Sequence, residues 1–118
     1  MIEELRIRDL GVINDAVVLP HRGLTVVTGE TGAGKTMIVT GIGLLLGDRA
    51  EARSVRNGTE RAVVEGRISV PTGPDAARLT GRVRGAGGDL DDDELVVARH
   101  ITAAGRSRAF LGGAQVPV

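Results

Sequence analysis

The residues best suited to chemistry form one run, Gly29-Glu30-Thr31-Gly32-Ala33-Gly34-Lys35-Thr36. The run matches the phosphate-binding pattern G-x-x-x-x-G-K-[ST] at every fixed position. A triphosphate needs many hydrogen-bond donors in a small volume, and successive backbone N–H groups supply them where the chain curls tightly around the anion. Glycines within the run permit that curl, because glycine tolerates positive φ and has no Cβ to hold the phosphate away.

Two side chains are predicted to complete this site. The Lys35 ammonium would reach the β- and γ-phosphates, and the Thr36 hydroxyl would bind Mg²⁺. Lys35 is also the only lysine among the 15 lysines and arginines of the chain, so the one compact ammonium stands where phosphate binding favours it. The competing interpretation is a glycine-rich turn that contains an incidental Lys-Thr pair.

The flanking sequence predicts the strand, loop and helix that this motif requires. Residues 24–28 (LTVVT) predict a short buried strand that leads into the loop. A helix is predicted to start at Lys35 and to continue through residues 37–46, where apolar side chains recur at helical spacing. Its positive N-terminal end would favour an anion, and Gly47 is predicted to cap its C-terminal end.

Alternating apolar and polar residues predict strands in most of the remaining chain. These predicted strands cover residues 2–8, 12–19, 62–70, 95–102, 106–111 and 116–118. A helical turn at 50–54, a helix at 75–84 and a glycine- and aspartate-rich loop at 85–93 lie between them. A doubly wound domain would alternate strand and helix throughout. We therefore predict a mixed α/β fold, with antiparallel hairpins at about 61–118 beside one strand–loop–helix unit.

Composition limits the fold and excludes several kinds of site. A chain of 118 residues forms one domain or part of one, and its core must rest on aliphatic side chains, because it has one Phe and no Trp or Tyr. The net charge of zero gives no argument for nucleic acid. The absence of cysteine excludes disulfides and cysteine-based zinc sites and fits a reducing cytoplasm. No signal peptide and no membrane-spanning run is predicted.

Several blocks around the phosphate-binding run resemble a known family. They are LRIRDL at 5–10, GLTVVTGETGAGKT at 23–36, LLLGDRA at 44–50, VRNG at 55–58, GRSRAFLGG at 105–113 and VP at 116–117. The phosphate-binding run alone is shared by many nucleotide-hydrolysing proteins. The full set, in this order and spacing, resembles the N-terminal segment of the RecN family of bacterial DNA repair proteins, which are relatives of the SMC ATPases.

The resemblance implies an ABC-type ATPase head that holds ATP and Mg²⁺. Two heads would form a homodimer over two ATP molecules, and the full-length protein would engage DNA during double-strand-break repair. The resemblance also implies a cytoplasmic, nucleoid-associated protein that does not enter membranes. Arg56 lies in a block that resembles the family, so it could contact nucleotide phosphate, the partner head or DNA. A solvated connecting segment is an equally good interpretation of Arg56.

The hydrolytic half of such a head is not visible in this sequence. There is no apolar strand ending in Asp-Glu (a Walker B motif), no signature motif of Ser-Gly-Gly type and no coiled-coil heptad pattern. Asp48 follows an apolar run, but it comes too soon after the loop to serve as the catalytic acid. We expect residues 1–118 to be the N-terminal part of a head, which binds ATP and needs a C-terminal half and a partner head for hydrolysis.

Two other functions remain open. The chain could be a small P-loop kinase or NTPase acting on a metabolite, although we find neither a second-substrate pocket nor a lid. It could also be a non-catalytic interaction fragment. The acidic residues 89–94 fit a solvated loop better than a calcium site, because an EF-hand loop needs glycine at its sixth position. His21 and His100 stand apart in the sequence, so a metal site built on them is not expected.

Overall fold

The structure is a computed structural model that describes residues 2–19, 24–26, 31–70, 73–90 and 93–117. Within these residues, seven strands form one sheet in the order β3-β2-β1-β4-β5-β6-β7. The strands are β1 (Ile2–Leu10), β2 (Ile13–Leu19), β3 (Leu24–Val26), β4 (Arg61–Ser69), β5 (Glu94–Thr102), β6 (Ser107–Leu111) and β7 (Ala114–Val116). Every neighbouring pair is antiparallel.

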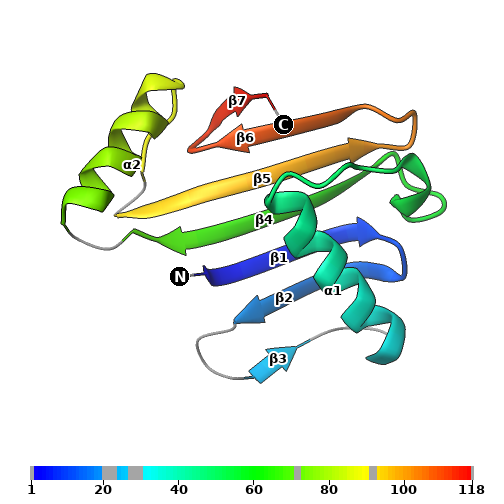
Figure 1. Cartoon of the computed structure of the whole chain (residues 1–118). Helices are drawn as coiled ribbons and strands as arrows, with labels where there is room; N and C mark the ends of the chain where they lie inside the picture. Colours follow the sequence, from blue (N-terminus) through cyan, green and yellow to red (C-terminus); the bar gives the residue numbers. More distant parts are fainter. Residues whose placement is uncertain (1, 20–23, 27–30, 71–72, 91–92, 118) are drawn as a thin grey trace.

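Two α-helices accompany the sheet. Helix α1 (Thr31–Leu45) lies across one face of the sheet, as Figure 1 shows, whereas α2 (Pro74–Gly85) lies beyond the ends of the strands. A short 3-10 segment, η2 (Ala52–Ser54), follows α1. The chain thus has two layers where α1 covers the sheet, and the largest cluster of buried side chains lies between them.

The core lies between α1 and the inward positions of the sheet. Strand residues alternate faces, so Leu5 and Ile7 on β1 lie inward with Val64 on β4, and all three are at most 1% exposed. Helix and sheet approach closely at Gly41, where an added Cβ would lie only 2.9 Å from Ile7 Cδ1. The remaining buried members of this cluster are Leu10, Ile13, Ala16, Val18, Leu44, Val55, Ala62 and Ile101.

The mixed fold with antiparallel hairpins is confirmed, but some boundaries differ from those predicted. Helix α1 begins at Thr31 rather than at Lys35. The N–H groups of a first helical turn have no acceptor inside the helix, so this turn can form within the motif while its N–H groups stay free to bind other acceptors. Strand β1 continues to Leu10, since Asp9 takes a positive φ of 54° without ending the strand. Strand β3 pairs with β2 at the edge of the same sheet instead of standing beside it. The last strand, Ala114–Val116, begins two residues earlier than the strand predicted at 116–118.

The face of the sheet opposite α1 carries charged side chains. Arg6 Nη2 lies 3.1 Å from Asp15 Oδ2 on the neighbouring strand, and Arg67 Nε lies 3.8 Å from Glu4 Oε2. Each of these side chains is more than a third exposed, and ion pairs in such settings contribute little to stability. This face is therefore largely solvated, and most of the apolar burial of the sheet lies on the α1 side.

His100 on β5 makes folding stability depend on pH. Its ring lies 4.7 Å from the Phe110 ring between centroids. Partial burial lowers the pKa of His100, Arg61 and Arg108 lower it further, and Glu65 opposes them. The unfolded chain therefore binds the proton more readily than the folded chain. It follows that stability is fully present above the unfolded pKa of about 6.5 and is lost as pH falls toward the lower folded value.

The variant His100→Gln should show a flatter dependence of melting temperature on pH than the wild-type chain between about pH 7 and pH 5. Melting curves followed by circular dichroism would measure this difference. His21→Gln is the matched control, because His21 is the only other histidine of the chain. Identical pH profiles for the wild-type chain and His100→Gln would contradict the assignment.

Candidate functional site

The predicted phosphate-binding run lies at the start of α1. Gly29 and Glu30 lie outside the described residues, and the backbone of Thr31 to Thr36 forms the first turns of the helix. The first N–H groups of a helix have no acceptor inside it, and the partial positive charge there attracts anions. The first turn of α1 contains no acidic residue that would oppose a phosphate. This end of α1 therefore suits an anion.

The elements around the run have the order that the motif requires. Strand β3 ends at Val26 on the sheet edge, and α1 begins at Thr31. Thr36 is exposed, and its backbone carbonyl accepts a hydrogen bond of 3.0 Å from Thr40 Oγ1. The structure thus places Thr36 at the surface of the first turns of α1, and its contact with Mg²⁺ stays a prediction.

A depression of about 420 Å³ lies close to the N-terminal half of α1. It is lined by Gly11, Val12, Arg56 and Asn57. An added Cβ on Gly11 would come within 3.1 Å of Met37 Cγ, so the turn after β1 touches α1 directly. The depression is open to solvent, and Gly11 in its lining is the residue that approaches α1.

Arg56 is fixed at the rim of this depression. Its backbone N–H donates to Asp9 O at 2.8 Å, and its Nη1 donates to Val12 O at 2.8 Å. One guanidinium nitrogen therefore has a structural role, and the guanidinium has further N–H groups beyond that bond. Contact between Arg56 and a phosphate, a partner head or DNA stays a prediction.

The C-terminal end of α1 is closed by a Schellman motif. Asp48 N–H donates to Gly43 O at 3.0 Å, Gly47 N–H donates to Leu44 O at 3.2 Å, and Gly47 has a φ of +103°. The predicted cap at Gly47 is confirmed. Asp48 belongs to this cap and not to the end of a strand, so the structure gives it no place as a catalytic acid.

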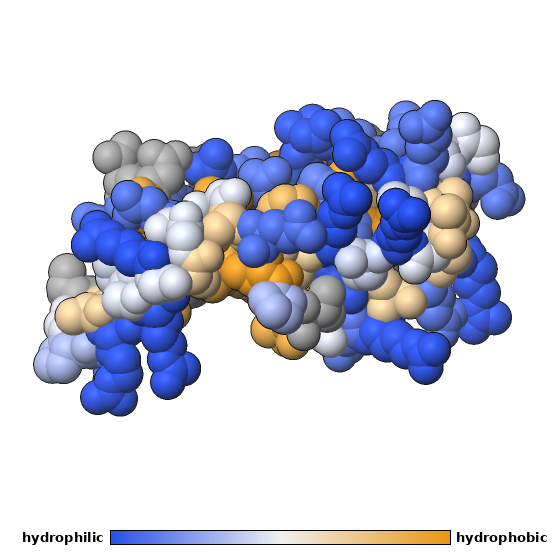
Figure 2. All heavy atoms as spheres, turned by 90° about the horizontal axis from the view of Figure 1, so that it is seen from above, coloured by the Kyte–Doolittle hydropathy of each residue, from blue (hydrophilic) through white to orange (hydrophobic). Residues whose placement is uncertain are grey.

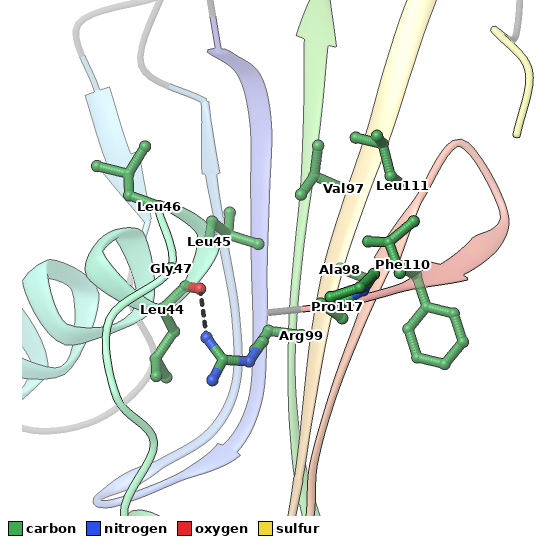
Figure 3. Close-up of a pocket in the computed structure, with 12 residues that line it drawn as sticks. Leu44, Leu45, Leu46, Gly47, Val97, Ala98, Arg99, Phe110, Leu111 and Pro117 are labelled. Atoms are coloured by element: carbon green, nitrogen blue, oxygen red, sulfur yellow. Dashed lines mark hydrogen bonds between the residues drawn. The ribbon is translucent and has the colours of Figure 1, made fainter. Parts of the chain in front are cut away.

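An apolar groove of about 230 Å³ separates the end of α1 from β5, β6 and β7. Leu44, Leu45 and Leu46 line one side, and Val97 and Leu111 line the other (Figure 3). Figure 2 shows apolar surface near the middle of the molecule, with hydrophilic side chains at both ends.

Arg99 also lines this groove, and sequence reasoning missed it. The signal was its place at an inward position of β5, between Val97 and Ile101 in the alternation that the strand pattern itself predicts. A charged residue at such a position requires buried hydrogen-bond acceptors.

The described residues offer few other sites. No group of three His, Asp or Glu side chains in this part of the chain could hold a metal ion. In the acidic segment, Asp89 Oδ1 lies 3.2 Å from Arg84 Nε, while Asp91 and Asp92 lie outside the described residues. Neither α1 nor α2 is long and apolar enough to cross a membrane.

Comparison with known proteins identifies a family and several relatives. A family model described as an AAA domain matches residues 4–96. The DNA repair protein RecN of Streptomyces coelicolor is 60% identical over 114 residues, which cover 97% of this chain and 19% of that protein. The DNA repair protein RecN of Mycobacterium tuberculosis is 51% identical over 120 residues, which cover 99% of this chain and 20% of that protein. The chain therefore spans about one fifth of the length of these relatives.

Solved structures show the same fold. One comes from work on the structural biochemistry of ATP-driven dimerization and DNA-stimulated activation of SMC ATPases. It superposes with a TM-score of 0.67 at 22% sequence identity, and the match covers 98% of this chain and 72% of that one. At this identity the likeness concerns the fold, and it agrees with part of an ABC-type head.

Proposed function

Because the chain belongs to the AAA domain family and matches the N-terminal region of RecN proteins, we propose that it is the ATP-binding segment of a RecN-like protein that acts in recombinational repair of DNA double-strand breaks. The predicted resemblance to the RecN family is confirmed. The main support for the proposal is the run from Gly29 to Thr36, which matches the phosphate-binding pattern. This run lies between the edge strand β3 and the first turns of α1.

Different groups of the run would bind the phosphates and the Mg²⁺ of the nucleotide. The backbone N–H groups of Gly29 to Gly34 would donate to the phosphate oxygens, and Lys35 would place a positive charge on the β- and γ-phosphates. Thr36 would offer its hydroxyl to Mg²⁺, and the donor set fits because a hydroxyl and phosphate oxygens are the hard oxygen ligands that this ion prefers. Bound Mg²⁺ would neutralise part of the phosphate charge.

The surface of α1 supports the idea that other protein segments complete the head. The helix is apolar on most sides, yet only one side packs on the sheet: Val39 is 69% exposed, and Leu46, which directly follows the helix, is 81% exposed. A helix that is apolar all round belongs inside a protein. We propose that other parts of a longer RecN-like protein cover this side, and that a second head and DNA join through that protein.

We expect the 118-residue chain to bind Mg-ATP and to hydrolyse none above background. The reason is that its sequence lacks a strand ending in Asp-Glu, which would supply the Mg²⁺-holding Asp and a general base. Phosphate release by the wild-type chain should equal that of Lys35→Ala and of buffer. Turnover that disappears in Lys35→Ala would contradict the proposal and favour a self-contained NTPase or a small kinase, which a screen of phosphoryl acceptors would identify.

A non-catalytic interaction fragment is tested separately. Partner capture from a cell extract should depend on Mg-ATP if the chain works as part of a head. Capture that is equal with and without nucleotide would favour the interaction fragment.

A further inference from the structure

Arg99 is the one charged side chain that is buried within the described part of the chain, with 3% of its surface exposed. It lies on β5 at a position that faces α1. Its Nε donates to Ser107 Oγ on β6 at 2.8 Å. Burial lowers the pKa of Arg99 and Asp48 opposes that change, but an arginine side chain keeps its proton in proteins. A permanent positive charge is therefore enclosed beside the end of α1.

The same guanidinium binds the C-terminal end of α1. Its Nη1 donates to Leu44 O at 2.9 Å and to Asp48 O at 2.9 Å, and Figure 3 shows the first of these bonds. Carbonyl groups in the last turn of a helix lack N–H partners farther along the helix and carry a partial negative charge, which a cation stabilises. Arg99 therefore joins the Schellman cap of α1 to two strands of the sheet.

The predicted phosphate-binding run occupies the opposite end of this helix. α1 has 15 residues, which corresponds to a length of about 22 Å. Over that length, a tilt of about 5° at the Arg99 end would move the first turn by about 2 Å. A shift of about 1 Å in a binding site is already enough to weaken its interactions.

We propose that Arg99 is a positioning residue for nucleoside triphosphate binding. By holding the C-terminal end of α1 against β5 and β6, it sets where the first-turn N–H groups and Lys35 meet the phosphates. This inference rests on the proposed function, since it assigns a remote determinant to the same site. Arg99 lies at the far end of α1 from the phosphates, so it acts through the orientation of the helix.

The test compares the Mg-ATP affinity of the wild-type chain with that of two variants by isothermal titration calorimetry. Arg99→Met keeps most of the side-chain volume but donates no hydrogen bond to α1, so we expect an affinity about tenfold weaker. Arg99→Lys keeps the charge with a different donor geometry, so its affinity should lie between the other two. Partial recovery in Arg99→Lys is the result that a loss of packing alone would not produce.

Val83→Ala is the matched control for stability. Val83 is fully buried on α2, which does not belong to the cluster around α1. This variant should lose stability and bind Mg-ATP like the wild-type chain. An equal loss of affinity in Val83→Ala would show that general destabilisation explains the effect, and it would overturn the inference.

If Arg99→Met does not fold, the Mg-ATP affinity of Ser107→Ala tests the inference instead. This variant removes only the acceptor for Arg99 Nε, and its affinity should fall about threefold. Unchanged affinity in folded Arg99→Met, or in Ser107→Ala where Arg99→Met does not fold, overturns the inference and leaves the proposed function standing. Absence of Mg-ATP binding by the wild-type chain overturns both.

Discussion

Replacing Gly41 with valine is expected to destabilise the chain by about 3 kcal/mol or more, because α1 could no longer lie at its observed distance from the sheet. A Cβ at this position would lie 2.9 Å from Ile7 Cδ1 and 3.5 Å from Val64 Cγ1, and the valine methyl groups would extend farther. Ile7 and Val64 are both 0% exposed, so neither has room to move aside. Urea unfolding followed by circular dichroism would measure the loss.

The control for this prediction is Gly81→Val on α2. A Cβ on Gly81 would meet no atom within 4 Å, and valine has the higher helix propensity, so this variant should be neutral or slightly more stable. The two substitutions are chemically identical and differ only in what the new side chain meets. If both variants lost the same stability, the close approach of α1 to β1 and β4 would be contradicted.

Replacing Lys35 with alanine is expected to lower the affinity for Mg-ATP by about 100-fold, which would remove weak binding from the measurable range. The variant loses the one ammonium that the motif directs to the β- and γ-phosphates. Isothermal titration calorimetry at low ionic strength would measure both affinities, because salt weakens contacts between charged groups.

Two further variants separate a specific contact from general attraction between charges. Arg82→Ala removes an exposed charge from α2 and should leave the affinity unchanged. Lys35→Arg keeps the charge but replaces a compact ammonium with a planar guanidinium, so it should restore little of the binding. Equal affinities in the wild-type chain and Lys35→Ala would refute the role of this residue.

Much of the sheet could be predicted because its pattern is local. In β4, Ala62 and Val64 alternate with Glu65 and Arg67, and the structure places the first pair inward and the second pair on the solvated face. Apolar and polar side chains that alternate along the chain reveal a strand with one buried face, whichever strands pair with it. Strand order could not be predicted in this way, since the pairing of β1 with β4 joins residues far apart in the chain.

The candidate site was predictable in part for the same reason. The motif from Gly29 to Thr36 is contiguous, so its residue types and spacing are visible without the fold. The start of α1 at Thr31 was not predictable, because glycine-rich sequence permits both a loop and a first helical turn. The carbonyls that Arg99 binds lie 55 and 51 residues away along the chain, and Arg56 reaches a carbonyl 44 residues away. Only the folded structure brings such pairs together.

The proposed function requires that backbone amides of Gly29 to Thr36 bind the phosphates of a nucleotide. Titration of the ¹⁵N-labelled chain with Mg-ATP, followed through the amide signals in nuclear magnetic resonance spectra, would detect this contact residue by residue. We predict saturable shifts concentrated at the amides of residues 29–36, which disappear in Lys35→Ala. Shifts confined to other parts of the chain, or no shifts at these amides at saturating Mg-ATP, would contradict it.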